Sequence, residues 1–493
     1  MPIDQTEPPE VDTPPIGIPT GNLVQSVCRN AAAQLAGRNL ISLFRLIAAS
    51  TIARTFGKEM FGQYSLVIVM LAIAEWLLDF GTSDVFVREI CRTPERGARL
   101  LRIMTALKLL QMAVASSSFV LLVLLLRYPS ETVKASLYAG VSLLFFGGVL
   151  IYHTVFKATL TIEREVTAEL ISVFAMIALL RVASSYRVSL AVIFACHMAS
   201  RATFFSLCYW FGKARFQLSL KGVTWPDVRW GFHSSAAIGS IGLMVTVYES
   251  IDVLLLSKLG SLADVAYYAG AQRFIAPIVV ALAAIGGTLY PLAATYWPGA
   301  RSDFDQSCQR AMDTVFVLAG MAVCLILAGS DFLMRLLGPD LAGGAAILRV
   351  LAIVLFAKAT SNTLGPVLYV VQAQNQALRL VAVALVFKTA LVVALAPAFG
   401  YIGVAFAAVI TDTATMVATL YLIRKYSGFH VRWAIPLKVG VIALIAAGTA
   451  RLLLPGNGPH AAVAAVAIFL PLSFLSGSVR LSEVLPLLKW RAP

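Results

Sequence analysis

The chain has 493 residues, of which 59% are hydrophobic and only 13% charged, and its formal net charge at pH 7 is +14. Soluble domains carry about 25% charged residues, so the composition excludes a soluble protein and predicts a polytopic α-helical membrane protein. Its apolar runs are about 20 residues long and do not alternate, which excludes an outer-membrane barrel. In a membrane protein the positive charge indicates basic cytoplasmic loops or a cationic cavity, and no nucleic-acid partner.

Residues 1–30 are proline-rich and acidic near their start and lack the apolar core of a signal peptide, which predicts a disordered cytoplasmic tail. About fourteen membrane spans follow. We place them at about 31–55, 61–82, 100–127, 135–157, 164–183, 187–211, 233–258, 264–293, 309–329, 343–371, 378–397, 401–424, 434–455 and 459–478. These spans form a first lobe over 31–211, a cytoplasmic linker over 212–232 and a second lobe over 233–424. Residues 425–493 add two further helices and a cytoplasmic tail.

The connecting segments carry most of their Lys and Arg on one side of this topology, which predicts that both termini are cytoplasmic. Six cysteines occur without a CxxC pair, and five histidines lack ligand spacing, so we expect neither disulfides nor a metal site. The phosphate-binding pattern GxxxxGK[ST] is absent from the sequence. We therefore predict no catalytic residues and no bound cofactor.

An internal repeat is suggested by two similar stretches. In TIARTFGKEMFGQY (51–64) an apolar helix ends near Gly57, and Tyr64 follows seven residues later; Gly260 and Tyr267 repeat this spacing. Glycine suits a tight inter-helix turn, and tyrosine suits the membrane interface. Since six spans separate the two stretches, the lobes have parallel topology, with a pseudo-two-fold axis normal to the membrane, as some transporters do.

The order of several segments resembles the Wzx-type polysaccharide flippases, whose superfamily also holds the MATE exporters. The segments are FRLIAASTIARTFGKEMFGQYSLVIVMLAIAEWLLDFGTSDVFVREI (44–90), IDVLLLSKLGSLADVAYYAGAQRFIAPIVVALAAIGGTLYPLAA (251–294), LLGPDLAGGAAILRVLAIVL (336–355) and LAPAFGYIGVAFAAVITD (395–412). The resemblance implies a MATE-like fold that moves undecaprenyl-diphosphate-linked oligosaccharides across the bacterial inner membrane by alternating access. It also implies that the last two helices border a groove for the polyprenyl tail. The helix 2–3 signature of lipid II flippases is not seen.

Basic residues inside the spans are the candidate substrate ligands, because arginine meets phosphate oxygens bidentately and stays charged. The resemblance places Arg45 and Arg273 beside a central cleft. With Arg201 and Lys388 they are predicted to bind the diphosphate, the alternative being ion pairs that serve packing alone. Lys108 and Arg349 lie near span ends and are expected to snorkel. The role of Lys358 stays open.

Acidic residues inside the spans are either ion-pair partners or ion-coupling carboxylates, with Na⁺ or H⁺ as the coupling ion. Glu249 and Asp252 are three residues apart and share a helical face that we expect to pair with Arg273. Asp412 and Glu75 are further candidates, whereas Asp79 is expected to face water. The charges of the stretch 248–273, including Asp264, are predicted to border the transport pathway.

The sequence thus favours a lipid-linked oligosaccharide flippase for exopolysaccharide, capsule or O-antigen synthesis, with a polysaccharide polymerase and a chain-length regulator as candidate partners. A cation-coupled multidrug exporter of the same superfamily is the alternative, and a surplus of intramembrane bases argues against it. A membrane glycosyltransferase or polymerase is the second alternative. Such enzymes usually need a sizeable external loop, and no external connection here is long.

Overall fold

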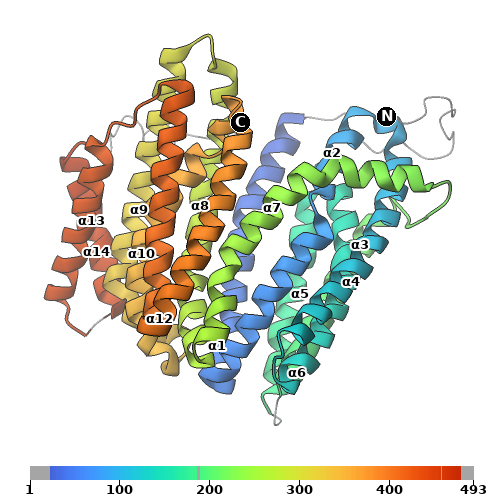
Figure 1. The fold of residues 1–493 in the computed structure, drawn as a ribbon, viewed down its shortest axis with the longest axis horizontal. Coiled ribbons are helices and arrows are strands. Elements are labelled where there is room, and N and C mark those ends of the chain that lie inside the picture. The colour runs from blue at the N-terminus through green and yellow to red at the C-terminus, as the bar shows by residue number, and fades with distance from the viewer. Residues whose placement is uncertain (1–22, 186–188, 457, 479–493) are drawn as a thin grey trace. The chain divides into compact units, whose positions relative to one another are not determined.

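The computed structural model describes residues 23–185, 189–456 and 458–478, and in this part of the chain the regular structure is entirely helical. Contacts divide the chain into two compact units, Met1–Ser250 and Ile251–Pro493. Twelve helices among the described residues are long and apolar enough to cross a membrane. Figure 1 shows these long helices and their order along the chain.

The first unit is built from five long helices, one shorter helix and the first part of α7. Its elements are α1 (Leu23–Asp79), α2 (Thr82–Arg92), the 3₁₀ turn η1 (Pro94–Arg96), α3 (Gly97–Leu125), α4 (Ser130–Ala158), α5 (Ile162–Ala183), α6 (Leu190–Gly212) and the start of α7 (Trp225–Leu259). Helix α4 packs on α3 and α6, and α5 packs on α1 and α6. Helix α1 begins at Leu23, so residues 23–30 of the predicted tail are helical here; residues 1–22 lie outside the described part.

Two long helices each cover two of the predicted spans. Helix α1 is broken at Gly57, whose backbone has φ 79° and ψ 172°. Helix α12 (Gln374–Ser427) is broken at Gly400, with φ 57° and ψ −140°. Only glycine adopts a positive φ without strain, so each helix stops and restarts at that residue. These two breaks account for the difference between about fourteen predicted spans and twelve continuous helices.

The first part of α7 belongs to the first unit because it packs against aromatic rings from the end of α1 and from the turn that follows. Trp76 Nε1 donates a hydrogen bond to the Gly239 carbonyl oxygen at 3.1 Å, and Phe80 stacks on Phe232 with ring centroids 5.4 Å apart. A Cβ on Gly242 would lie 1.8 Å from the Trp76 ring. The boundary between the units therefore falls inside α7, whereas the sequence places the whole helix in the second lobe.

The second unit begins within α7 and continues with eight further elements. They are α8 (Leu262–Tyr296), α9 (Arg301–Leu337), the 3₁₀ turn η2 (Pro339–Gly344), α10 (Ala345–Leu364), the short α11 (Val367–Val370), α12, α13 (Ala434–Leu453) and α14 (Gly458–Leu475). Helix α10 packs on α8, α9 and α12, and α13 and α14 pack on each other and on α9. Figure 1 shows α13 and α14 together at the edge of this unit.

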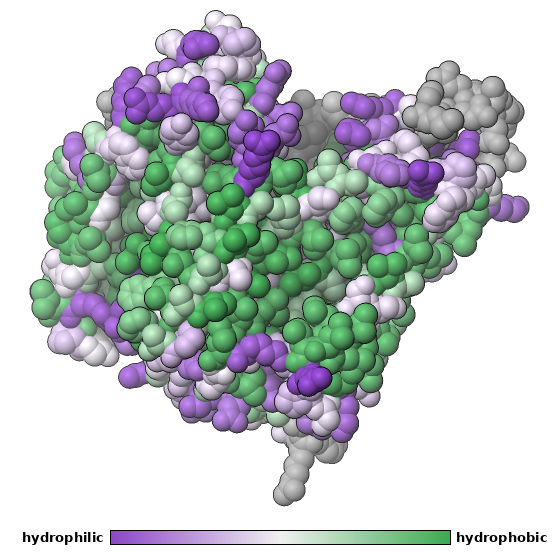
Figure 2. Space-filling model, in the orientation of Figure 1, coloured by the Kyte–Doolittle hydropathy of each residue, from purple (hydrophilic) through white to green (hydrophobic). Residues whose placement is uncertain are grey.

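Large hydrophobic side chains remain on the outside of both units, including Leu124 on α3 and Val386 on α12. In the view of Figure 2, hydrophobic residues cover the middle of the helices and hydrophilic residues gather toward their ends. This pattern suits helices whose middle lies in hydrocarbon and whose ends meet water.

The connection between α6 and α7 is held against the ends of α4 and α5. Arg215 donates hydrogen bonds through Nη1 to the hydroxyls of Thr159 at 2.8 Å and Thr161 at 2.6 Å. Partial burial lowers the pKa of the Arg215 guanidinium, and the nearby charge of Arg164 lowers it further. These contacts order a segment that the sequence predicts only as a linker.

Candidate functional site

Most of the charged residues that the sequence places inside the spans come together in clusters, each within one unit. We take these clusters as the candidate functional site, because charges at membrane depth are costly and commonly mark a transport pathway. Two clusters lie in the first unit and one in the second, and a further ion pair lies near helix ends of the second unit.

The first cluster pairs arginines with glutamates of neighbouring helices. Arg45 on α1 forms an ion pair with Glu169 on α5, and the arginine side chain is 54% exposed. Arg201 on α6 pairs with Glu75 on α1 and lies over the Phe146 ring, 4.4 Å from its centroid. Arg45 and Arg201, both predicted to bind a diphosphate, therefore each have a carboxylate partner in this conformation.

Further polar residues surround these pairs. His153 on α4 is 2.7 Å through Nδ1 from the Glu165 carboxylate on α5. His197 on α6 is buried, and its Nε2 atom has no hydrogen-bond partner among the described residues. Glu165 and Glu169 were missed by the sequence reasoning. Their spacing of four residues on one helical face was a usable signal, but both lie close to the start of the predicted span and resemble boundary residues there.

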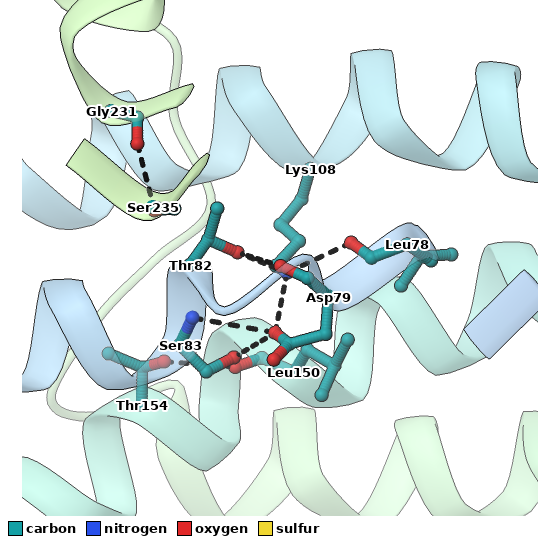
Figure 3. Close-up of polar contacts among 9 residues, drawn as sticks. All are labelled: Leu78, Asp79, Thr82, Ser83, Lys108, Leu150, Thr154, Gly231 and Ser235. Carbon is teal, nitrogen blue, oxygen red and sulfur yellow. Dashed lines mark hydrogen bonds and ion pairs between the residues drawn. The ribbon is translucent and has the colours of Figure 1, made fainter. Parts of the chain in front are cut away.

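The second cluster holds the turn between α1 and α2 (Figure 3). Lys108 on α3 is fully buried, and its Nζ atom donates to the Asp79 carboxylate at 2.9 Å, the Thr82 hydroxyl at 2.6 Å and the Leu78 carbonyl oxygen at 3.1 Å. The Ser83 hydroxyl also donates to the Asp79 carboxylate. Two sequence predictions are corrected here: Lys108 does not snorkel, and Asp79 faces this lysine instead of water.

The backbone of this turn explains why a buried cation is placed there. Phe80 and Gly81 both have positive φ, at 44° and 71°. Such a conformation is uncommon for a bulky residue such as phenylalanine. The lysine binds carbonyl groups at the end of α1 that the helix leaves without an intrahelical partner, so it stabilises the sharp change of direction.

The third cluster lies in the second unit and joins α7, α8 and α12. Asp252 and Lys388 are 1% and 2% exposed, and Nζ lies 2.8 Å from Asp252 Oδ2. The Tyr268 hydroxyl donates to the same oxygen at 2.6 Å, and Gln272 Nε2 donates to the tyrosine hydroxyl at 3.3 Å. Asp252 Oδ1 is buried and accepts no hydrogen bond from the described residues. Asp252 is thus buried away from solvent, and its carboxylate forms an ion pair with the ammonium of Lys388.

A second pair lies beside the first. Lys358 on α10 is 3.9 Å through Nζ from Asp412 Oδ2 on α12, and both side chains are largely buried. The sequence left the role of Lys358 open, and the structure places this lysine beside Asp412. Tyr268 and Gln272 were not predicted, because a tyrosine and a glutamine in a helix carry no pattern that marks a polar cluster.

The remaining predicted residues of the second unit have simpler surroundings. Arg349 on α10 binds both carboxylate oxygens of Asp331, at 2.7 and 2.6 Å, and Arg451 pairs with the same aspartate. Asp264 forms a capping box with Ser261 at the start of α8, so this carboxylate caps a helix. Arg273 lies half-buried on α8, next to Gln272 in sequence.

Glu249 lies at the end of the first unit and is exposed, although it is three residues from the buried Asp252. The predicted turn residues lie at or near helix breaks. Gly57 and Gly260 lie where helices break, but Tyr64 is buried against Phe194, with ring centroids 5.5 Å apart. Tyr267 packs on Tyr401 at 5.4 Å. Both tyrosines pack on another aromatic ring.

Comparison with a family model gives a match to the family described as “Polysaccharide biosynthesis protein” over residues 27–297. This range is more than half of the chain. No curated protein matches the sequence.

Several solved structures share the fold. One is a lipid II flippase MurJ in an inward closed conformation, with a TM-score of 0.74, 13% identity, and coverage of 93% of this chain and 100% of that chain. Another is a multidrug resistance MATE family transporter of the MOP superfamily in an inward-facing conformation, with a TM-score of 0.62, 16% identity, and coverage of 82% and 98%. A third is a multidrug resistance MATE family transporter of the same superfamily in an outward-facing conformation, with a TM-score of 0.59, 16% identity, and coverage of 82% and 96%. The likeness confirms the predicted MATE-like, all-helical membrane fold.

Proposed function

Because the chain belongs to the polysaccharide biosynthesis protein family, we propose that it moves undecaprenyl-diphosphate-linked oligosaccharide repeat units across the bacterial inner membrane, with both termini in the cytoplasm. The family match is the observation that carries this proposal. Family and fold are those of transporters and flippases, which supports translocation over catalysis.

The arginine–glutamate pairs of the first unit support a diphosphate as the charged group that crosses. A guanidinium binds phosphate oxygens with the same fork geometry that binds a carboxylate. Glu169 and Glu75 then serve as placeholders that neutralise Arg45 and Arg201 when no substrate is bound. An arriving diphosphate would exchange with the glutamate, so the arginine is never left as an isolated charge at membrane depth.

The test is genetic and chemical. In a strain that carries this gene with its polysaccharide pathway, deletion should cause polyprenyl-linked glycan to accumulate on the cytoplasmic face and surface polysaccharide to disappear. A multidrug exporter would instead leave surface polysaccharide unchanged and reduce resistance to cationic drugs. This outcome would overturn the proposal.

Two arginine variants then test the site. Arg45→Ala and Arg273→Ala are each expected to abolish complementation of the deletion while the protein stays inserted at normal amount. Glu169→Gln is the matched control for Arg45→Ala, because it breaks the same ion pair but keeps the arginine. Export should persist in Glu169→Gln. Equal loss of export in Glu169→Gln and Arg45→Ala would mean that transport depends on the ion pair itself, which would contradict a role for Arg45 as the diphosphate ligand.

A further inference from the structure

The sequence leaves open whether Asp252 and Asp412 couple transport to Na⁺ or to H⁺, and the cluster around them bears on this question. A bare alkali cation needs a dry set of oxygen ligands with a net negative charge. Asp252 Oδ1 and Oδ2, the Tyr268 hydroxyl and the Gln272 side-chain carbonyl could provide such a set on α7 and α8.

The charges in the cluster do not leave room for that cation. Lys388 Nζ lies 2.8 Å from Asp252 Oδ2. The ammonium therefore occupies the place next to the carboxylate where an alkali cation would bind. Lys358 supplies a second ammonium 3.9 Å from Asp412. Two carboxylates and two ammonium groups sum to zero, so an additional cation would enter a site whose negative charge is already neutralised, close to two fixed positive charges.

We propose that the Lys388 ammonium is a tethered substitute for the alkali cation, so that the Asp252 cluster binds no Na⁺. The burial of both partners supports this assignment. A lysine that is 2% exposed and hydrogen-bonded to a carboxylate that is 1% exposed cannot leave without exposing a buried charge. The inference deepens the proposed transport function, but its test measures ion binding, so either can fail without the other.

The experiment compares purified full-length protein in about 100 mM NaCl with the same protein in about 100 mM choline chloride, by melting temperature and by binding of radioactive Na⁺. Wild type should show the same melting temperature in both salts and no saturable Na⁺ binding. Lys388→Ala should melt at least about 5 °C lower in choline, because Asp252 loses its partner. In NaCl it should regain about 3 °C and bind Na⁺ saturably.

The double variant Lys388→Ala/Asp252→Asn is the matched control, since it removes the lysine and also the negative charge that would attract Na⁺. It should show no difference between the two salts. Saturable Na⁺ binding by wild type would overturn the proposal, and this arm stands even if a variant does not fold. A folded Lys388→Ala that binds no Na⁺ would also overturn it, because the oxygens around Asp252 would then not form a cation site.

Discussion

Lys108 shows at the residue scale how a buried charge can serve the fold. Its ammonium has three kinds of acceptor around it: a carboxylate, a hydroxyl and backbone carbonyl oxygens. Removing one partner of a buried ion pair leaves the other partner as an uncompensated charge. The lysine also stabilises the left-handed backbone of Phe80 and Gly81, so two separate costs arise when it is lost.

We expect Lys108→Met to lower the free energy of unfolding by about 3–5 kcal/mol, measured by denaturant titration in detergent. The control is Lys134→Met, which removes an exposed lysine paired with Glu131 on the same kind of helix. That change should cost no more than about 1 kcal/mol. A similar loss in both variants would contradict the role assigned to the Lys108 cluster.

The sequence predicts which residues carry charge inside the spans, but it does not predict their partners. Arg45, Arg201 and Lys388 stand out because charges are rare in apolar runs. Their pairing with Glu169, Glu75 and Asp252 depends on how each helix is rotated about its axis. Lys108 and Asp79 illustrate the limit. Both lie near span ends, where snorkelling is the common outcome, and only the packing of α3 against the end of α1 buries them.

At the scale of helices, small residues on α7 decide which elements pack together. Membrane helices approach closely where glycine or serine replaces larger side chains. Gly231, Ser235, Gly239 and Gly242 recur every three or four residues on one face of this helix. Phe86 lies over Gly231, Phe80 over Gly239, and Trp76 over Gly242. The spacing was readable in the sequence, but the partner rings are more than one hundred residues away and leave no local signal.

Substituting Gly242 tests this packing. A Cβ there would meet the Trp76 ring at 1.8 Å, so Gly242→Ala must displace the indole or the helix. Overpacking of this kind costs about 1–3 kcal/mol. Gly448→Ala on α13 is the control, since a Cβ there meets nothing within 4 Å and alanine favours a helix. We expect a lower melting temperature for Gly242→Ala and an unchanged or higher one for Gly448→Ala. The reverse order would mean that α7 does not pack on Trp76.

The helix breaks at Gly57 and Gly400 show what the sequence predicts well. Both glycines lie between apolar runs that are each long enough to cross a bilayer, so span length alone requires an interruption there. What span length does not predict is that the second helix resumes without a loop.

At the scale of the whole molecule, apolar run length predicted an all-helical membrane protein, and the resemblance of several segments in their order implied the MATE-like arrangement that the solved structures share. The sequence repeat places the change of unit before α7, whereas the contacts place it after Ser250. The repeat reflects similarity between two stretches of sequence. The end of the first unit depends instead on the packing of small residues of α7 against aromatic rings of the first unit.

Helices α13 and α14 give the last prediction at this scale. They pack on α9 through small residues: a Cβ on Gly320 would lie 2.5 Å from Val439, and one on Gly329 would lie 2.9 Å from Ala462. Helices that associate in a bilayer gain little from the hydrophobic effect, because lipid tails cover an apolar helix surface as well as another helix does. We therefore expect a chain truncated after Ser427 to insert and fold, with little change in melting temperature.

The same truncation should abolish surface polysaccharide in the complementation assay, because the proposed groove for the polyprenyl tail would lose its border. A chain truncated after Ser478 is the control, since it keeps both helices, and it should complement. If the chain truncated after Ser427 exports polysaccharide normally, α13 and α14 are not part of the lipid path, and the substrate's tail must be accommodated by the remaining helices. Insertion is checked by protease protection, so that a loss of export is not mistaken for a loss of protein.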